Sequence, residues 1–458
     1  MQPGGNIAAS LGDYSVNLGQ FSAAALDRAR HLSTGLPLAS FASKSIVARE
    51  IDALVHRLAR QGLLEYRLSS SRDERDLVVI EPQVPDYWPR RAKLGSSDTV
   101  VLSRFAYLRR RGNEMVLESP LAGALFRIGD PAIAATLAAL SQPQKIGKLD
   151  RKALSFNLLL LELLVESQIL LKLDAKGGDG FRMNEGDGNL VLWDFHDLVF
   201  HTRSTEGRQA NPVGATFTYA GVVPPSPAVR PPWAGSKIDL RKLSSPEPDS
   251  RFPKLLRERH STRDFDDKNP VTLGELAQFL DTTARVVSEW KSEPYFEGGS
   301  DVTYSTRPYP SAGSAYELEL YLTVANCDGL ARGLYHYDAG SHTLVAISAS
   351  PQQLQAHLAA AQFAMDAPGQ PQILITIAAR FGRVSWKYSS IAYSLILKDV
   401  GSLIQTLYLA ATDMGLGGCA IGSTNIDLFA KMTELEFHIE GPVGQFALGR
   451  GRTPEVHG

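Results

Sequence analysis

The chain has 458 residues and a formal net charge of −2; hydrophobic residues make up 44% of it and charged residues 21%. This length suffices for two or three domains, each with its own core, and the composition is that of an ordinary soluble globular protein. A near-neutral charge argues against bulk attraction to nucleic acid or to an anionic membrane. The two cysteines, Cys327 and Cys419, are too few for a disulfide framework and lack metal-ligand spacing, so we expect both in a core.

The N-terminus has no basic stretch followed by an apolar one, so we expect no signal peptide and a cytoplasmic protein. The longest apolar run, residues 391–414, contains Lys398, Asp399 and Gln405. Polar residues at this density are typical of a buried helix and not of a membrane span. We therefore expect no membrane partner.

The first part of the chain predicts two small units of similar design. Apolar residues in 43–62 recur at helical spacing, and two strand-like runs follow at 64–68 and 77–80. A helix followed by a two-stranded wing predicts a winged-helix-like unit over residues 1–90. Strand-like and helical runs between 99 and 173 indicate a second such unit, which we assign, with a connecting segment, to residues 91–220.

Winged-helix units bind DNA, or bind peptides by adding a strand at the wing. The candidate DNA patch is Arg109, Arg110 and Arg111, although three adjacent arginines are also typical of a solvated turn. Because the whole chain is near neutral, strong phosphate binding is disfavoured. We expect these units to hold a peptide, and we expect no nucleic-acid partner.

A histidine pair and a proline-rich stretch precede the C-terminal half. His196 and His201 lie close to acidic residues, but no third ligand cluster accompanies them. We therefore favour a structural or substrate-facing role over a metal site. The proline-rich stretch predicts an extended linker over 221–250, which places the start of the main domain at residue 251.

Arg259, Ser261 and Arg263 alternate along the chain. In an extended segment, alternation places all three side chains on one face. Two guanidiniums flanking a hydroxyl suit a phosphate, because arginine offers forked donors to phosphate oxygens. An exposed charged turn is the alternative interpretation.

Two glycine-containing segments indicate close approach of a ligand to the backbone. The loop of small residues at 310–314 runs into an alternating strand, 318–324, and would allow a flat ligand to approach. The helix predicted at 391–414 ends in a glycine-rich segment, 415–418. This segment either faces a cofactor or simply caps the helix.

Taken in order, RHSTRDF (259–265), PSAG (310–313), GLGG (415–418) and LGR (448–450) resemble the FMN-dependent nitroreductase fold. More narrowly they resemble the SagB-type dehydrogenases, the azoline oxidases of peptide natural-product pathways. The resemblance implies an α+β fold: a C-terminal nitroreductase-like FMN domain at 251–458, preceded by winged-helix-like, peptide-binding units. It also implies a homodimer with the flavin at the subunit interface.

The resemblance assigns Arg259, Ser261 and Arg263 to the phosphate and ribityl chain of FMN. The loop against the isoalloxazine ring matches Pro310, Ser311, Ala312 and Ser314. The backbone near the reactive edge of the flavin matches Leu416, Gly417 and Gly418, and a terminal phosphate contact matches Arg450 and Arg452. Wider relatives often carry Asn where this chain has Ser314 and Gln where it has Tyr316. That departure is compatible with the azoline branch.

Azoline oxidases are similar in having a Lys–Tyr pair near the flavin, which here is Lys387 and Tyr388. Oxidising an azoline ring removes a hydride, which FMN accepts, and a proton, which needs a base. Burial makes a lysine easier to deprotonate and a tyrosine harder, so we expect Lys387 to be the base and Tyr388 its hydrogen-bonding partner or proton relay. The alternative is an interface lysine whose ammonium reaches solvent.

The sequence thus predicts an FMN-dependent oxidoreductase that converts thiazoline or oxazoline rings of a ribosomally made precursor peptide to thiazole or oxazole. Dioxygen is the expected electron acceptor, and a cyclodehydratase is a candidate partner. Two alternatives stay open: an NAD(P)H-dependent nitro- or quinone reductase, and a winged-helix adaptor with a vestigial flavin domain.

Overall fold

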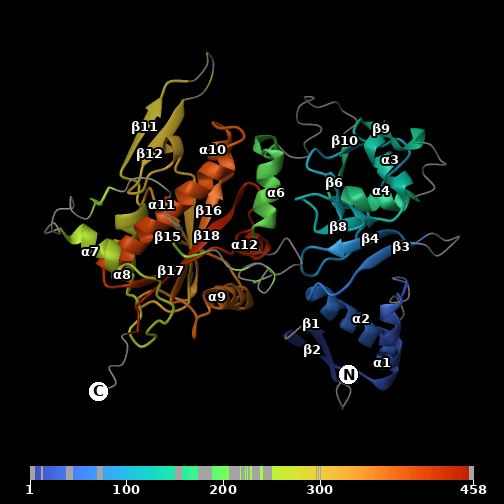
Figure 1. Cartoon of the computed structure of the whole chain (residues 1–458), viewed down its shortest axis with the longest axis horizontal. Coiled ribbons are helices and arrows are strands. Elements are labelled where there is room, and N and C mark those ends of the chain that lie inside the picture. The colour runs from blue at the N-terminus through green and yellow to red at the C-terminus, as the bar shows by residue number, and fades with distance from the viewer. Residues whose placement is uncertain are drawn as a thin grey trace. The chain divides into compact units, whose positions relative to one another are not determined.

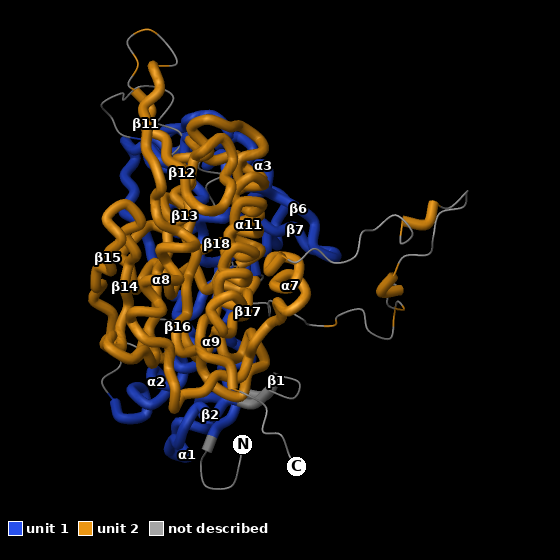
Figure 2. The backbone as a smooth tube through the Cα atoms, turned by 90° about the vertical axis from the view of Figure 1, so that its left-hand side faces the viewer, with its two compact units in different colours: residues 1–191, 207–211 blue, residues 192–206, 212–458 orange. Residues whose placement is uncertain are grey.

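The structure, a computed structural model, describes residues 6–11, 14–37, 45–69, 76–149, 157–173, 188–205, 250–294 and 301–452, with a few single residues between. It forms two compact units: residues 1–191 with 207–211, and residues 192–206 with 212–458 (Figure 2). The linker predicted at 221–250 lies almost wholly outside the described residues.

The N-terminal unit begins with an antiparallel pair, β1 (Asn6–Leu11) and β2 (Tyr14–Gln20), followed by helices α1 (Ala23–Ala29) and α2 (Ile46–Arg60) (Figure 1). The helix predicted at 43–62 is therefore present. It starts at Ile46 because the Ser45 hydroxyl accepts a hydrogen bond from the amide of Ala48 and caps the first turn.

A five-stranded antiparallel sheet forms the centre of this unit, in the order β3-β4-β8-β7-β6. Its strands are β3 (Tyr66–Ser69), β4 (Asp76–Pro82), β6 (Tyr107–Arg111), β7 (Glu114–Glu118) and β8 (Ala124–Ile128). β3 and β4 confirm the strands predicted at 64–68 and 77–80. Strands from both sides of residue 90 join one sheet and one core, so the boundary expected there does not divide the unit.

The remaining elements of the unit are a three-stranded sheet and two helices. They are β5 (Thr99–Leu102), β9 (Gln144–Lys145), β10 (Leu170–Leu173), α3 (Pro131–Ala139) and α4 (Asn157–Glu166), with the sheet order β10-β5-β9. The winged-helix assignment remains a prediction.

The arginine triplet lies on β6, and two of its members are neutralised by carboxylates. Arg109 pairs with Glu118, and Arg111 donates to both oxygens of Glu81 at 3.1 and 2.7 Å. Guanidiniums already paired in this way offer little free positive charge to a phosphate backbone. This pairing weakens the DNA-binding alternative.

The C-terminal unit is built on a six-stranded antiparallel sheet, in the order β15-β14-β13-β16-β18-β17. These strands are β13 (Leu318–Val324), β14 (Gly333–Asp338), β15 (Thr343–Ile347), β16 (Ile373–Arg380), β17 (Gly417–Ile421) and β18 (Glu440–Gly449). A separate hairpin joins β11 (Ser288–Ser292) to β12 (Val302–Thr306).

Helices cover both faces of this sheet (Figure 1). They are α6 (Phe195–Arg203), α7 (Arg251–Glu258), α8 (Leu273–Ala284), α9 (Pro351–Met365), α10 (Phe381–Ser385), α11 (Ala392–Asp413) and α12 (Ile426–Thr433). α9 and α12 pack on the face that carries Tyr321, and α11 packs on the opposite face against Gly444 and Phe446.

β13 is buried on both faces, whereas alternation predicted burial of one face only. Alternation predicts that the buried residues are Leu318, Leu320, Leu322 and Val324. These four are buried, but Tyr321 and Thr323 on the other face are buried too. The difference arises because α9 covers the second face, where His357 is hydrogen-bonded to Thr323 at 3.0 Å. A single strand does not report a helix that packs on it from elsewhere in the chain.

α11 confirms the long buried helix predicted at 391–414. One polar stripe of it stays exposed, and its members are Ser394, Lys398, Gly401 and Gln405. Among the described residues, no helix combines the length and the apolar character needed to cross a bilayer.

Candidate active site

Lys387 and Tyr388 follow the last turn of α10 and lie against the loop of small residues. The Lys387 ammonium donates a hydrogen bond to the Gly313 carbonyl at 3.3 Å, and its nitrogen lies 5.2 Å from the centre of the Tyr304 ring. A Cβ atom at Gly313 would stand 2.3 Å from the Tyr388 hydroxyl and 2.8 Å from the Lys387 nitrogen. Gly313 also has φ +56°, so glycine is required here for both reasons.

The structure therefore brings together the Lys–Tyr pair and the loop that the sequence assigned to one site. It differs from the expectation in one respect: Lys387 is exposed in this chain and not kept out of water. Any desolvation of its ammonium must come from a bound molecule or from a second chain.

Two buried carboxylates, Glu317 and Asp399, accept hydrogen bonds from the loop at 310–314. The Ser311 hydroxyl lies 3.2 Å from Glu317 and 3.1 Å from Asp399, and the Ala312 amide donates to Asp399 at 2.8 Å. Burial raises the pKa of Glu317 to about 7, with the nearby Asp399 adding to the rise, and burial also raises the pKa of Asp399. The pair therefore tends to retain a proton near neutral pH.

Sequence reasoning missed both carboxylates. The signal for Asp399 was present, because a charged residue on the buried stripe of an apolar helix needs a partner. Glu317 gave no such signal, because its neighbour Asp399 comes from α11, far away in the chain. Of the other predicted loop residues, Pro310 is exposed, and Ser314 adopts φ +56° in a short 3₁₀ turn, Ala312–Ser314.

The segment with alternating arginines lies at the other end of α11. The Ser261 hydroxyl is 2.8 Å from the hydroxyl of Tyr408, and the Arg259 guanidinium lies 5.1 Å from the centre of that ring. Asp399 and Tyr408 are about 13 Å apart along the helix axis, so α11 supports both groups of predicted residues. Arg263 is exposed.

Gly417 and Gly418 are buried in β17, where they allow two protein segments to approach. A Cβ atom at Gly417 would stand 2.6 Å from Thr262, and one at Gly418 would stand 2.2 Å from Phe446. The Thr262 amide donates to the Gly418 carbonyl at 2.8 Å. These glycines thus fix the arginine segment to the sheet, and Leu416 beside them is also buried.

Arg450 and Arg452 are paired with carboxylates. Arg450 donates to both oxygens of Glu275 at 2.7 and 2.8 Å, and Arg450 is the main cause of the lowered pKa of Glu275. Glu275 also forms the capping box of α8 with Thr272. Arg452 lies 3.4 Å from Asp264.

Among the described residues, Arg259 and Arg263 form no ion pair with a carboxylate, unlike Arg450 and Arg452. Two unpaired guanidiniums flanking a hydroxyl match the charge and geometry of a phosphate group. This donor set fits the phosphate end of FMN. Sequence spacing alone did not distinguish the two pairs of arginines, because their carboxylate partners lie elsewhere in the chain.

α6 supports the start of α11, close to the Lys–Tyr pair. His201 is buried in an aromatic cluster, with its Nδ1 atom 3.0 Å from the Tyr393 hydroxyl and its ring stacked on Trp193. His196 is exposed beside Asp194, which caps the helix. No group of residues that could hold a metal ion occurs in the described parts of the chain. The geometry gives His201 a packing role.

Comparison with known proteins shows the family to which this chain belongs. The nitroreductase family model matches residues 256–450, and the model of the cyanobactin oxidase ThcOx matches residues 100–210. A protein of Methanocaldococcus jannaschii named as a nitroreductase is 30% identical over 171 residues, which is 37% of this chain and 77% of that protein. The chain therefore belongs to the nitroreductase family and is an oxidoreductase, which confirms the family expected from the sequence.

Two solved structures are similar to part of this chain. One is the Escherichia coli microcin synthetase McbBCD complex with truncated pro-MccB17 bound, of which a chain is 20% identical, with 58% of this chain and 97% of that chain covered and a TM-score of 0.41. The other is a nitroreductase of Ralstonia eutropha JMP134, 24% identical, with 45% and 88% covered and a TM-score of 0.34.

Proposed function

We propose that this protein oxidises thiazoline or oxazoline rings in a ribosomally made peptide to thiazole or oxazole, with FMN as the cofactor. The observation that carries the proposal is the contact of Lys387 and Tyr388 with the loop at Gly313. The match of residues 100–210 to the cyanobactin oxidase model supports a peptide substrate.

FMN would be held at its phosphate end by Arg259, Ser261 and Arg263, and the ring would lie near the loop 310–314 and the segment 416–418. When bound, FMN supplies the acceptor for the hydride removed from the azoline ring, and dioxygen reoxidises it. The ion pairs of Arg450 and Arg452 favour a structural role for these two arginines over a phosphate contact.

Lys387 takes the proton that the ring loses. An ordinary lysine with a pKa of 10.4 costs roughly 4.6 kcal/mol to deprotonate at pH 7, so the base must be prepared by its surroundings. The Lys387 nitrogen lies 5.2 and 5.6 Å from the centres of the Tyr304 and Tyr388 rings, and its side chain is exposed. Covering of the exposed side chain by substrate, flavin or a second subunit must therefore supply the desolvation that frees the base.

Tyr388 lies on the same side of Gly313 as the Lys387 nitrogen and serves as its hydrogen-bonding partner or proton relay. The N-terminal unit holds the peptide, and a cyclodehydratase supplies the azoline. A homodimer places two such sites in one molecule.

The competing activity is reduction of nitro compounds or quinones by NAD(P)H, which the Methanocaldococcus relative's name favours. The two are distinguished by mixing the yellow protein with either NADPH in the absence of air or a thiazoline peptide in air. We expect slow bleaching by NADPH, and peroxide formed in step with peptide oxidation. Rapid bleaching by NADPH with turnover of a nitroarene, and no peroxide with the peptide, would reject the proposal.

A further inference from the structure

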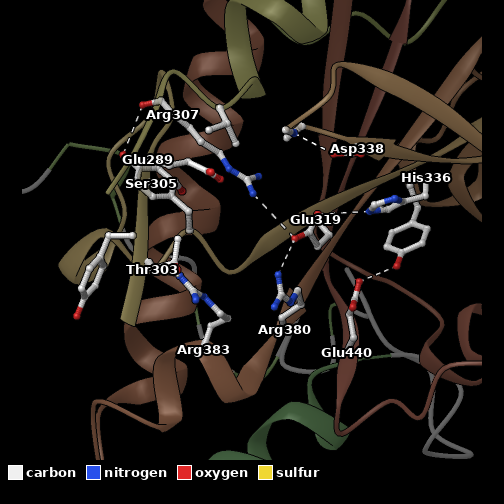
Figure 3. A pocket seen from close by; sticks show the side chains of 16 residues that line it. Glu289, Thr303, Ser305, Arg307, Glu319, His336, Asp338, Arg380, Arg383 and Glu440 are labelled. Carbon is white, nitrogen blue, oxygen red and sulfur yellow. Dashed lines mark hydrogen bonds and ion pairs between the residues drawn. The ribbon is translucent and has the colours of Figure 1, made fainter. Parts of the chain in front are cut away.

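The C-terminal unit contains a cavity of about 450 Å³ that none of the predicted site residues line. It lies between the β11–β12 hairpin and the sheet, and charged side chains dominate its wall (Figure 3). The residues that matter for its chemistry are Tyr304, Arg307, Glu319, His336, Arg380 and Arg383.

Arg307 is the unusual member of this wall. Its side chain is only 8% exposed, and within the described structure it donates one hydrogen bond, from Nη1 to the Leu318 carbonyl at 2.9 Å. Its Nη2 atom is 3.9 Å from Glu319, which is too long for a hydrogen bond, and its Nε atom has no partner among the described residues. The guanidinium also lies 5.9 Å from the centre of the Tyr316 ring. A buried Nε–H donor without a described partner is costly unless an acceptor binds there.

Two more guanidiniums line the cavity beside it. Arg383 donates only to the carbonyls of Ala315 and Thr303 and pairs with no carboxylate in the described structure. Arg380, which is 51% exposed, lies 3.4 Å from Glu319. Figure 3 shows Arg307 and Arg380 both directed at Glu319, so these two guanidiniums share one carboxylate.

The wall also carries four carboxylates, Glu289, Glu319, Asp338 and Glu440, and protein groups engage three of them. His336 lies 3.4 Å from Glu319 and competes for the same carboxylate. Glu440 accepts a hydrogen bond from Tyr321 at 2.6 Å, and burial raises the pKa of Glu440. Asp338 is occupied by the amides of Gly340 and Ser341 on the opposite side.

The cavity shares its wall with the candidate active site. Tyr304, which lines the cavity, is the ring nearest to the Lys387 ammonium, at 5.2 Å. Arg383 donates to the Ala315 carbonyl at 2.9 Å, two residues along the loop from Gly313, which accepts from Lys387. A molecule in the cavity would therefore lie beside Tyr304, the side chain next to the proposed base Lys387.

We propose that the cavity binds a carboxylate group of the peptide substrate and so positions the azoline ring at Lys387. This rests on the proposed function. A carboxylate fits better than a phosphate, because Glu289, Glu319, Asp338 and Glu440 line the same cavity and would repel a dianion. A peptide brings amide N–H donors beside its carboxylate, and these suit the acidic side of the wall.

The test compares three fluorescent thiazoline peptides that differ only in charge: one with a free C-terminal carboxylate, one C-terminally amidated with an aspartate side chain, and one amidated without an acid. Their affinities are measured by anisotropy against the full-length flavoprotein, the variant Arg380→Gln with Arg383→Gln, and the control Arg332→Gln. Arg332 is exposed and lies outside the cavity. Arg307 is left in place because it is buried.

We expect at least one carboxylate peptide to bind about tenfold more tightly than the neutral peptide, as charged hydrogen bonds predict. The double variant should lose that preference and the control should keep it. The preferred peptide shows whether the cavity binds a C-terminal carboxylate or an aspartate side chain. Equal affinity for all three peptides, or a preference that survives in the double variant, overturns the proposal. Carboxylate-selective binding without ring oxidation would count against the proposed function and not against this site.

Discussion

Lys387 is the residue on which the proposed chemistry depends, and its replacement separates catalysis from cofactor binding. Because Lys387 is exposed and, among the described residues, makes one hydrogen bond, to Gly313, Lys387→Ala should fold normally and bind FMN. Azole formation should fall by a factor of 10² to 10⁴, the usual contribution of a positioned base. The flavin absorbance spectrum and the rate of azole formation are the readouts. Lys398→Ala, an exposed lysine on α11, is the control, and full activity in Lys387→Ala would remove the base assignment.

Glu317 should make stability depend on pH. Its pKa is raised to about 7 in the folded chain, so the folded state holds this proton more tightly than the unfolded one. The contribution to stability is complete below pH 4 and is lost as the pH rises through 7, by up to about 3 kcal/mol. Glu317→Gln cannot lose a proton, so we expect its urea midpoint to fall less than that of the wild type between pH 5 and pH 8.

The matched control for this comparison is Glu258→Gln, at an exposed glutamate on α7. It should follow the wild-type pH dependence. If Glu317→Gln and the wild type lose stability in parallel, the buried carboxylate pair does not hold a proton and the account of the loop is wrong.

At the scale of elements, the four predicted phosphate arginines should divide into two classes. Arg263→Gln removes an exposed guanidinium that pairs with no carboxylate of the described residues, so FMN affinity should fall about tenfold or more while the melting temperature is unchanged. Arg450→Gln breaks the ion pair with Glu275 at the start of α8, so the melting temperature should fall by a few degrees with little change in FMN affinity. Fluorescence titration of FMN and thermal melts measure both, and equal effects on affinity would restore Arg450 as a phosphate contact.

The elements themselves were largely accessible from the sequence. The helices α2 and α11 and the strands β3, β4 and β13 follow from spacing and apolar runs. The sheet that joins β3 and β4 to β6, β7 and β8 could not be predicted, because pairing between distant strands leaves no local pattern. For the same reason the cavity around Arg307, which gathers residues from six segments, was missed.

At the scale of the whole molecule, the surface around the Lys–Tyr pair suits a second subunit. Trp386 and Ile391 flank the pair and are 52% and 51% exposed, and the base assignment requires a cover for Lys387. We expect a homodimer of twice 49.8 kDa by light scattering. Ile391→Asp should weaken it, whereas Phe363→Asp, at another exposed apolar residue, should not. A monomeric flavoprotein with full activity would exclude this arrangement.

The activity proposed for the whole chain is removal of hydrogen from azoline rings. The most direct measurement is mass spectrometry of a thiazoline-containing peptide after incubation in air with the purified yellow protein, beside a sample with Lys387→Ala. We expect a loss of two hydrogens per ring with the wild type and an unchanged mass with the variant. An unchanged mass with the wild type, when the protein carries FMN and the peptide is bound, would contradict the proposed activity.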